Sequence, residues 1–133
     1  MRRDHGAVPV EFAAAVGLLL FPIFVFVMTI APVVERRTVA GRAAAEAARA
    51  FAVADDESSG RSAAQSIVDQ IDANHPFSLS LSLAGTLDRG AVVTASVVVG
   101  MPIVLFPGID GITVADYTAT HQEEVDLFRS LDP

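Results

Sequence analysis

Residues Phe12–Val34 read FAAAVGLLLFPIFVFVMTIAPVV, and this run contains no charged side chain. A helix rises about 1.5 Å per residue, so the run is roughly 35 Å long and exceeds a hydrocarbon core of about 30 Å. Apolar residues lie on every side of it, unlike the one-sided pattern of a helix that packs on a soluble core. The run therefore predicts a helix that is inserted into a membrane.

A cleaved secretory signal peptide is the first competing interpretation of this run. The apolar region of such peptides is roughly 7 to 15 residues long and precedes a cleavage site with small residues. Here the run is longer, and Pro32 directly follows its best small residue, Ala31, which makes a poor cleavage site. A retained membrane helix therefore explains the run better.

The composition of the chain limits its domain number and the classes of function that it can have. The chain has 133 residues, enough for one small domain. Its formal net charge is -7, and all its basic residues are Arg. An acidic chain lacks the positive surface that binds nucleic acid, so DNA and RNA are not expected partners. The sequence contains no Cys, which excludes disulfides and thiol chemistry.

The segment after the apolar run is rich in Ala, the residue with the highest helix propensity. It reads TVAGRAAAEAARAFAVADD from Thr38, contains no Pro, and predicts that the helix continues to about Ala54. Its small side chains permit close approach, and we expect them to pack against the protein's own sheet and leave the other faces for a partner helix. These residues are Ala40, Ala43, Ala44, Ala47, Ala48 and Ala54.

The rest of the chain predicts a shorter helix and three strands. Ser62 and Gln65 match an S-x-x-Q capping box, so the second helix is expected at Ser62–Ala73, after a linker that reads DDESSG. From Phe77–Leu83 the sequence FSLSLSL alternates between apolar and polar residues, which is typical of a half-buried strand. The sequence Asp88-Arg89-Gly90 is then expected to form a turn.

Two further strands are expected at 91–99 (AVVTASVVV) and 112–122 (ITVADYTATHQ), with a loop from Gly100 that contains Pro102 and Pro107. Sequential strands with short connections predict an antiparallel meander. The predicted fold class is α+β, with a long N-terminal helix that is half transmembrane and half exported, a second short helix and a three-stranded antiparallel β-meander. The expected organisation is a cytoplasmic leader at 1–6, a transmembrane helix at 7–34, an exported helix continuation and linker at 35–60, and an exported α+β domain at 61–133.

The sequence contains no pattern that is typical of an active site or a metal site. His5, His75 and His121 stand far apart and form no ligand pair, and each is explained by solvent contact or helix capping. The acidic residues 55–57 lack the spacing of a Ca²⁺-binding loop. No Gly-rich phosphate loop and no G-x-S-x-G sequence is present. We therefore expect no enzyme activity, no cofactor, no metal and no small-molecule substrate.

Glu11 is a carboxylate at the edge of the apolar run, where a charge is costly near lipid. A structural explanation is that Pro9 occupies the first helical position, so that Glu11 is a first-turn acid that complements the helix dipole. That explanation accounts for an acid in the turn. It does not account for the whole arrangement of a basic leader, Gly6, four residues, Glu-Phe and an apolar helix.

That arrangement, spelled RRDHGAVPVEFA, resembles the N-terminus of type IV pilin-like precursors, and in particular the TadE-like family of the tight-adherence (Flp) pilus machinery. The resemblance implies that a prepilin peptidase cuts after Gly6 on the cytoplasmic face, so that Ala7 becomes the first mature residue and Glu11 the fifth. It also implies assembly with other pilin-like subunits, in which Glu11 pairs with the Ala7 amine of a neighbour. A larger exported part than a minimal Flp pilin, without a disulfide loop, favours a minor subunit.

The expected location is the cytoplasmic membrane, with a single span, the N-terminus inside, the C-terminal domain outside, and pilus association after processing. Arg2 and Arg3 in the leader favour this orientation, whereas Arg36 and Arg37 flank the other end of the span. The alternative is an unprocessed single-pass membrane protein whose exported domain binds another envelope component. A secreted enzyme or metal-binding module is the third class of function.

Overall fold

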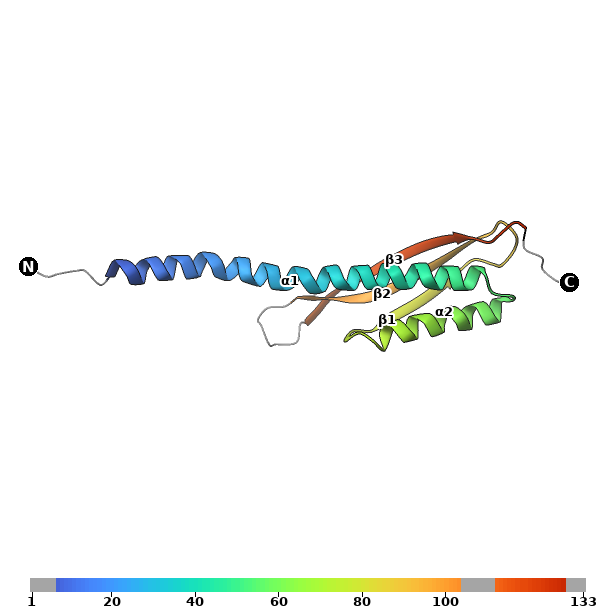
Figure 1. The fold of residues 1–133 in the computed structure, drawn as a ribbon, viewed down its shortest axis with the longest axis horizontal. Coiled ribbons are helices and arrows are strands. Elements are labelled where there is room, and N and C mark those ends of the chain that lie inside the picture. The colour runs from blue at the N-terminus through green and yellow to red at the C-terminus, as the bar shows by residue number, and fades with distance from the viewer. Residues whose placement is uncertain (1–6, 104–111, 129–133) are drawn as a thin grey trace, which may run out of the picture.

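One helix carries both the apolar run and the Ala-rich segment that follows it. The computed structural model describes residues 7–103 and 112–128, and these form two helices and three strands (Figure 1). Helix α1 is Ala7–Ala52, and Pro22 and Pro32 lie inside it without interrupting it. The predicted long helix is confirmed, and it ends close to the expected position.

Helix α2 is Glu57–Asp72, and it begins earlier than predicted. Its N-cap is Asp56, whose carboxylate accepts from the backbone N–H groups of Ser58 and Ser59, while the Ser59 hydroxyl accepts from the Asp56 N–H. Ser62 lies inside the helix and donates its hydroxyl to the Ser58 carbonyl. The predicted start at Ser62 was wrong because Asp56 already satisfies the free N–H groups of the first turn.

The three strands form one antiparallel sheet in the order β1-β2-β3, which confirms the predicted meander. They are β1 at Leu79–Ala84, β2 at Val92–Ile103 and β3 at Ile112–Glu124. In the turn before β2, Gly90 has a φ of 74°, a left-handed conformation that favours glycine.

Strand β2 is longer than predicted. It includes Gly100 and Pro102, which were expected to lie in a loop. The last pair between β1 and β2 joins Leu79 to Val99, so this extension of β2 pairs with β3 alone. The register shifts between Met101 and Pro102. Pro102 is tolerated because one side of the strand is unpaired there and the irregularity accommodates its missing N–H.

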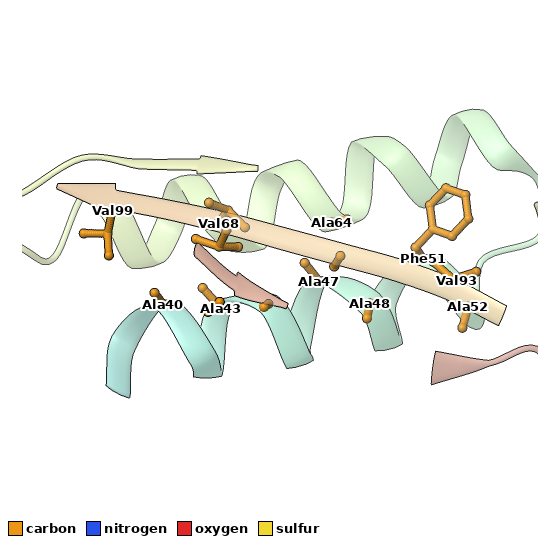
Figure 2. Close-up of a cluster of buried hydrophobic side chains, with 14 of the residues drawn as sticks. Ala40, Ala43, Ala47, Ala48, Phe51, Ala52, Ala64, Val68, Val93 and Val99 are labelled. Atoms are coloured by element: carbon orange, nitrogen blue, oxygen red, sulfur yellow. The ribbon is translucent and has the colours of Figure 1, made fainter. Parts of the chain in front are cut away.

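Both helices cover the same face of the sheet, and their buried side chains form one apolar core (Figure 2). The largest buried side chains include Phe51 of α1, Val68 of α2 and Val97 of β2, and the described residues bury no polar or charged side chain. The predicted packing of the Ala residues is confirmed, except that Ala54 is partly exposed. The completely buried ones are Ala40, Ala43, Ala44, Ala47 and Ala48.

Candidate functional site

The N-terminal half of α1 extends beyond the sheet and is not covered by any described residue (Figure 1). Large apolar side chains are exposed along it, among them Leu18 at 80% and Phe26 at 65%. Between Pro9 and Ala52 the helix is long and apolar enough to cross a membrane, with a mean hydropathy of 2.6 in its most apolar part. An exposed apolar surface of this extent is typical of a site that contacts lipid or another protein.

Glu11 lies on this uncovered half of α1 and is exposed. Helix α1 begins at Ala7, earlier than the start expected at Pro9, so its first turn contains no acidic residue. The dipole effect falls off within the first turn, which weakens the explanation of Glu11 as a dipole-complementing acid. Among the described residues, no side chain or backbone group forms a hydrogen bond or ion pair with the Glu11 carboxylate.

The proposed processing residues lie at the edge of the described structure. Gly6 is outside the described residues, and Ala7 is the first residue of α1. Pro9 lies in the first turn, where backbone N–H groups have no acceptor within the helix, so the missing N–H of Pro costs no hydrogen bond. The backbone of α1 is therefore helical from the residue that would become the mature N-terminus, and Glu11 follows it by one turn.

A junction of two arginines marks where α1 meets the sheet. Arg36 donates a hydrogen bond from Nη1 to the Gly100 carbonyl, and its guanidinium carbon lies 4.9 Å from the ring centroid of Phe77. The guanidinium carbon of Arg37 lies 5.1 Å from the ring centroid of Tyr117. Both contacts have cation–π geometry, and together they attach the start of the packed half of α1 to segments near all three strands.

Sequence reasoning treated Arg36 and Arg37 as charges relevant to orientation and missed their structural role. The contacts join residues far apart in the chain, and no local pattern relates an Arg in a helix to an aromatic residue in a later strand. The available signal was weak. It consisted of two adjacent arginines directly after the apolar run, and of Tyr117, the only tyrosine of the chain.

The histidines and acidic residues are dispersed in the structure. Within 7–103 and 112–128, no three His, Cys, Asp or Glu side chains come together as a candidate metal site. His75 Nδ1 lies 2.7 Å from the Ile71 carbonyl at the end of α2, and His121 Nε2 lies 3.4 Å from Glu123 on β3. His5 is outside the described residues. The expectation that the protein is not an enzyme stays a prediction.

Comparison of the chain with protein-family models, with curated proteins and with solved structures finds no match. The resemblance to TadE-like proteins therefore stays a prediction from the sequence, and the N-terminal residues carry most of it. The uncovered apolar half of α1 carries Glu11, and the arginine junction connects this half to the sheet.

Proposed function

We propose that the chain is a minor pilin-like subunit of a tight-adherence or related type IV-like apparatus, processed after Gly6 and assembled through the N-terminal half of α1. The observation that carries this proposal is the division of α1 into two halves. The C-terminal half packs in the protein's own core. The N-terminal half exposes apolar side chains and one carboxylate to its surroundings.

The position of Glu11 supports a role between subunits. An acid without a partner is unfavourable next to lipid, and the described part of the chain supplies no partner. Cleavage after Gly6 creates an α-amine at Ala7, one turn from Glu11. In a bundle of parallel helices, pairing of Glu11 with that amine on a neighbour sets a stagger of about 6 Å, the rise of four residues.

The packed half of α1 supports assembly in a different way. Small side chains bring the helix close to the sheet, and the contacts of Arg36 and Arg37 hold the junction. The exported domain and the membrane helix are thus joined without a flexible linker between them. The position that α1 takes among neighbouring apolar helices therefore also determines the position of the exported domain.

Sequencing of the N-terminus of the protein extracted from membranes tests the proposal. A mature chain that begins at Ala7 is the expected result. A chain that begins at Met1 contradicts processing and favours an unprocessed single-pass protein whose exported domain binds another envelope component. Expression with and without a prepilin peptidase serves as the control, because only that enzyme should change the N-terminus.

A further inference from the structure

A groove lies between α2 and the free edge of β1, on the opposite side of β1 from β2. Its volume is about 720 Å³. One side is formed by polar and charged side chains of α2, and the other by β1. The residues that line it include Arg61, Gln65, Asp69, Gln70, Leu81 and Leu83.

The backbone of β1 presents hydrogen-bonding groups to this groove. The Leu79 N–H donates to Asp72 Oδ1 at 2.6 Å and therefore points away from β2. In an antiparallel pair the direction of these groups alternates along the strand, so Leu81 and Leu83 also direct their N–H and C=O groups to the free edge. None of the described residues makes a hydrogen bond to these groups.

The edge of β1 also lacks two of the features that usually prevent pairing with another strand, namely charged residues and Pro. Its sequence LSLSLA contains no charged residue and no Pro. The other edge strand, β3, carries Asp116, His121, Glu123 and Glu124. Charges on edge strands oppose pairing with other chains, so the two edges of this sheet differ in their capacity to accept a strand.

The charges beside the groove define the chemistry of its occupant. Arg61 has Glu57 within 3.9 Å, which offsets its positive charge. Asp69 accepts a hydrogen bond from Gln65, and Asp72 accepts from the Leu79 N–H, but no basic residue of the described chain lies within ion-pair distance of either. At Asp69 the groove therefore presents a negative charge without a basic partner, and this position favours a ligand with a basic side chain.

A second copy of the chain does not fit this edge. Helix α1 and the strands run along the same long axis (Figure 1). Antiparallel pairing of β1 with β1 of another copy would reverse that axis and direct the two apolar helices to opposite sides, so both could not enter one membrane. Two copies in the same orientation would bring β1 against β3, whose acidic residues have the same sign of charge as Asp69 and Asp72.

From these observations we infer that the groove binds a short extended segment of a partner protein, which adds to β1 as a fourth strand and places a basic side chain near Asp69. Backbone hydrogen bonds to Leu81 and Leu83 supply binding, and the alternate side chains of the segment face α2. This site lies on the α+β domain and does not depend on cleavage after Gly6, so its failure and that of the proposed function are distinguishable.

The test uses the full chain in lipid nanodiscs and a fluorescent peptide, acetyl-TVTKTVT-amide, whose Val and Lys side chains share one face of an extended strand. Leu81→Pro removes the N–H that faces the groove, and Leu81→Ala is the matched control that removes the same side chain but keeps the N–H. The Leu81→Pro variant is expected to bind about tenfold more weakly than Leu81→Ala, as anisotropy titration measures.

A second measurement does not rely on the folding of a Pro variant. Binding of the peptide to the wild-type chain is expected to slow hydrogen exchange at the amides of Leu81 and Leu83, and Asp69→Asn is expected to weaken binding severalfold. Replacement of Lys by Glu in the peptide is expected to weaken binding as well. Absence of saturable binding at about 1 mM, protection elsewhere in the chain, or self-association through β1 would overturn the inference.

Discussion

Arg36 lies over the ring of Phe77, with its guanidinium carbon 4.9 Å from the ring centroid, at the point where the uncovered half of α1 ends. The same guanidinium donates to the Gly100 carbonyl, just beyond the last pair between β1 and β2. The Arg36 side chain thus binds the backbone of β2 just beyond the point where β1 stops pairing with it. The direction in which α1 leaves the sheet is held by this contact.

We expect Arg36→Ala to destabilise the α+β domain by about 1–2 kcal/mol, because it removes a cation–π contact and a hydrogen bond from a charged donor. Chemical denaturation of the full chain in nanodiscs, followed by circular dichroism, measures this change. Arg36→Lys should give an intermediate value, since an ammonium keeps the charge but loses the planar stacking surface. Equal stability of Arg36→Ala and the wild type would contradict the role of this contact.

Two helical glycines are expected to respond in opposite ways to the same substitution. Gly41 has nothing within 4 Å of an added Cβ, so Gly41→Ala should stabilise the domain by about 0.5–1 kcal/mol through helix propensity. At Gly60 an added Cβ lies 3.1 Å from the Phe51 ring and 3.2 Å from the Phe51 carbonyl. Phe51 is fully buried and has little room to move.

At Gly60 the added methyl group overpacks the contact with Phe51, which typically costs about 1–3 kcal/mol and exceeds the gain from helix propensity. Gly60→Ala should therefore be less stable than the wild type. Parallel thermal melts of the two variants measure the difference directly. An increase in stability for Gly60→Ala similar to that for Gly41→Ala would show that α1 and α2 are not packed closely at this turn.

The fold was largely predictable from the sequence because its main signals are local in the chain. The long helix follows from an uninterrupted apolar run and Ala-rich continuation, and β1 follows from strict alternation around Leu79–Ala84. The start of α2 was missed because several polar residues in that stretch are able to cap a helix, and local pattern does not rank them. Asp56 provides the cap in the structure, and the close packing of Gly60 on Phe51, which local sequence does not show, lies in the first turns of the same helix.

The candidate site was predictable only in part. Glu11 stands out because a charge next to an apolar run is unusual, whereas the junction at Arg36 and the open edge of β1 depend on contacts between distant segments. Pro102 was read as a loop residue because Pro interrupts paired strands. The sequence does not show that β2 lacks one neighbour at that point, and the tolerance for Pro depends on that fact.

The cap of α2 should give the domain a specific response to acid. Hydrogen bonds from the Ser58 hydroxyl and from the Ser59 N–H and hydroxyl lower the pKa of Asp56 from its ordinary 3.8 to about 2. A lowered pKa in the folded state means that the stabilisation is fully present above pH 3.8 and is lost as the pH falls toward 2. Other carboxylates titrate in this range, so the comparison needs a matched variant.

Asp56→Asn keeps an acceptor at the cap but removes the titrating group. We expect its melting temperature at neutral pH to lie a few degrees below that of the wild type, because a neutral acceptor bonds the N–H groups less strongly. The difference between the two proteins should shrink as the pH falls from about 4 to about 2. A constant difference across this range would exclude the carboxylate as the source of the acid response.

Gly6→Leu is expected to leave the precursor inserted but uncleaved. The prediction rests on the resemblance of the N-terminus to prepilin-like proteins, in which the peptidase must admit a small residue at the scissile bond. Mass spectrometry of the membrane-extracted protein distinguishes the precursor from a chain that begins at Ala7. Gly17→Leu is the matched control, because Gly17 lies within α1 with nothing within 4 Å of an added Cβ, and its precursor should be cleaved normally.

Glu11 gives the sharpest test of assembly, because its two explanations predict different outcomes for Glu11→Ala and Glu11→Asp. If the acid only complements the helix dipole, Asp should replace Glu, and Ala should cost at most about 1 kcal/mol with association intact. If Glu11 pairs with the amine of a neighbouring Ala7, removal of the acid leaves that amine without a partner and costs about 1–3 kcal/mol. That cost corresponds to a roughly five- to hundredfold loss of association.

We therefore expect Glu11→Ala to be inserted and cleaved normally but to fail to co-purify with other pilin-like subunits, with Glu11→Asp intermediate because its side chain is shorter. Moving the acid one turn along the same side of α1, in the double variant Glu11→Ala with Ala15→Glu, keeps the charge but shifts it by about 6 Å from the amine. This variant should also fail to associate, because the charge is present at the wrong depth. Wild-type co-purification of Glu11→Ala would show that the carboxylate has no role between subunits.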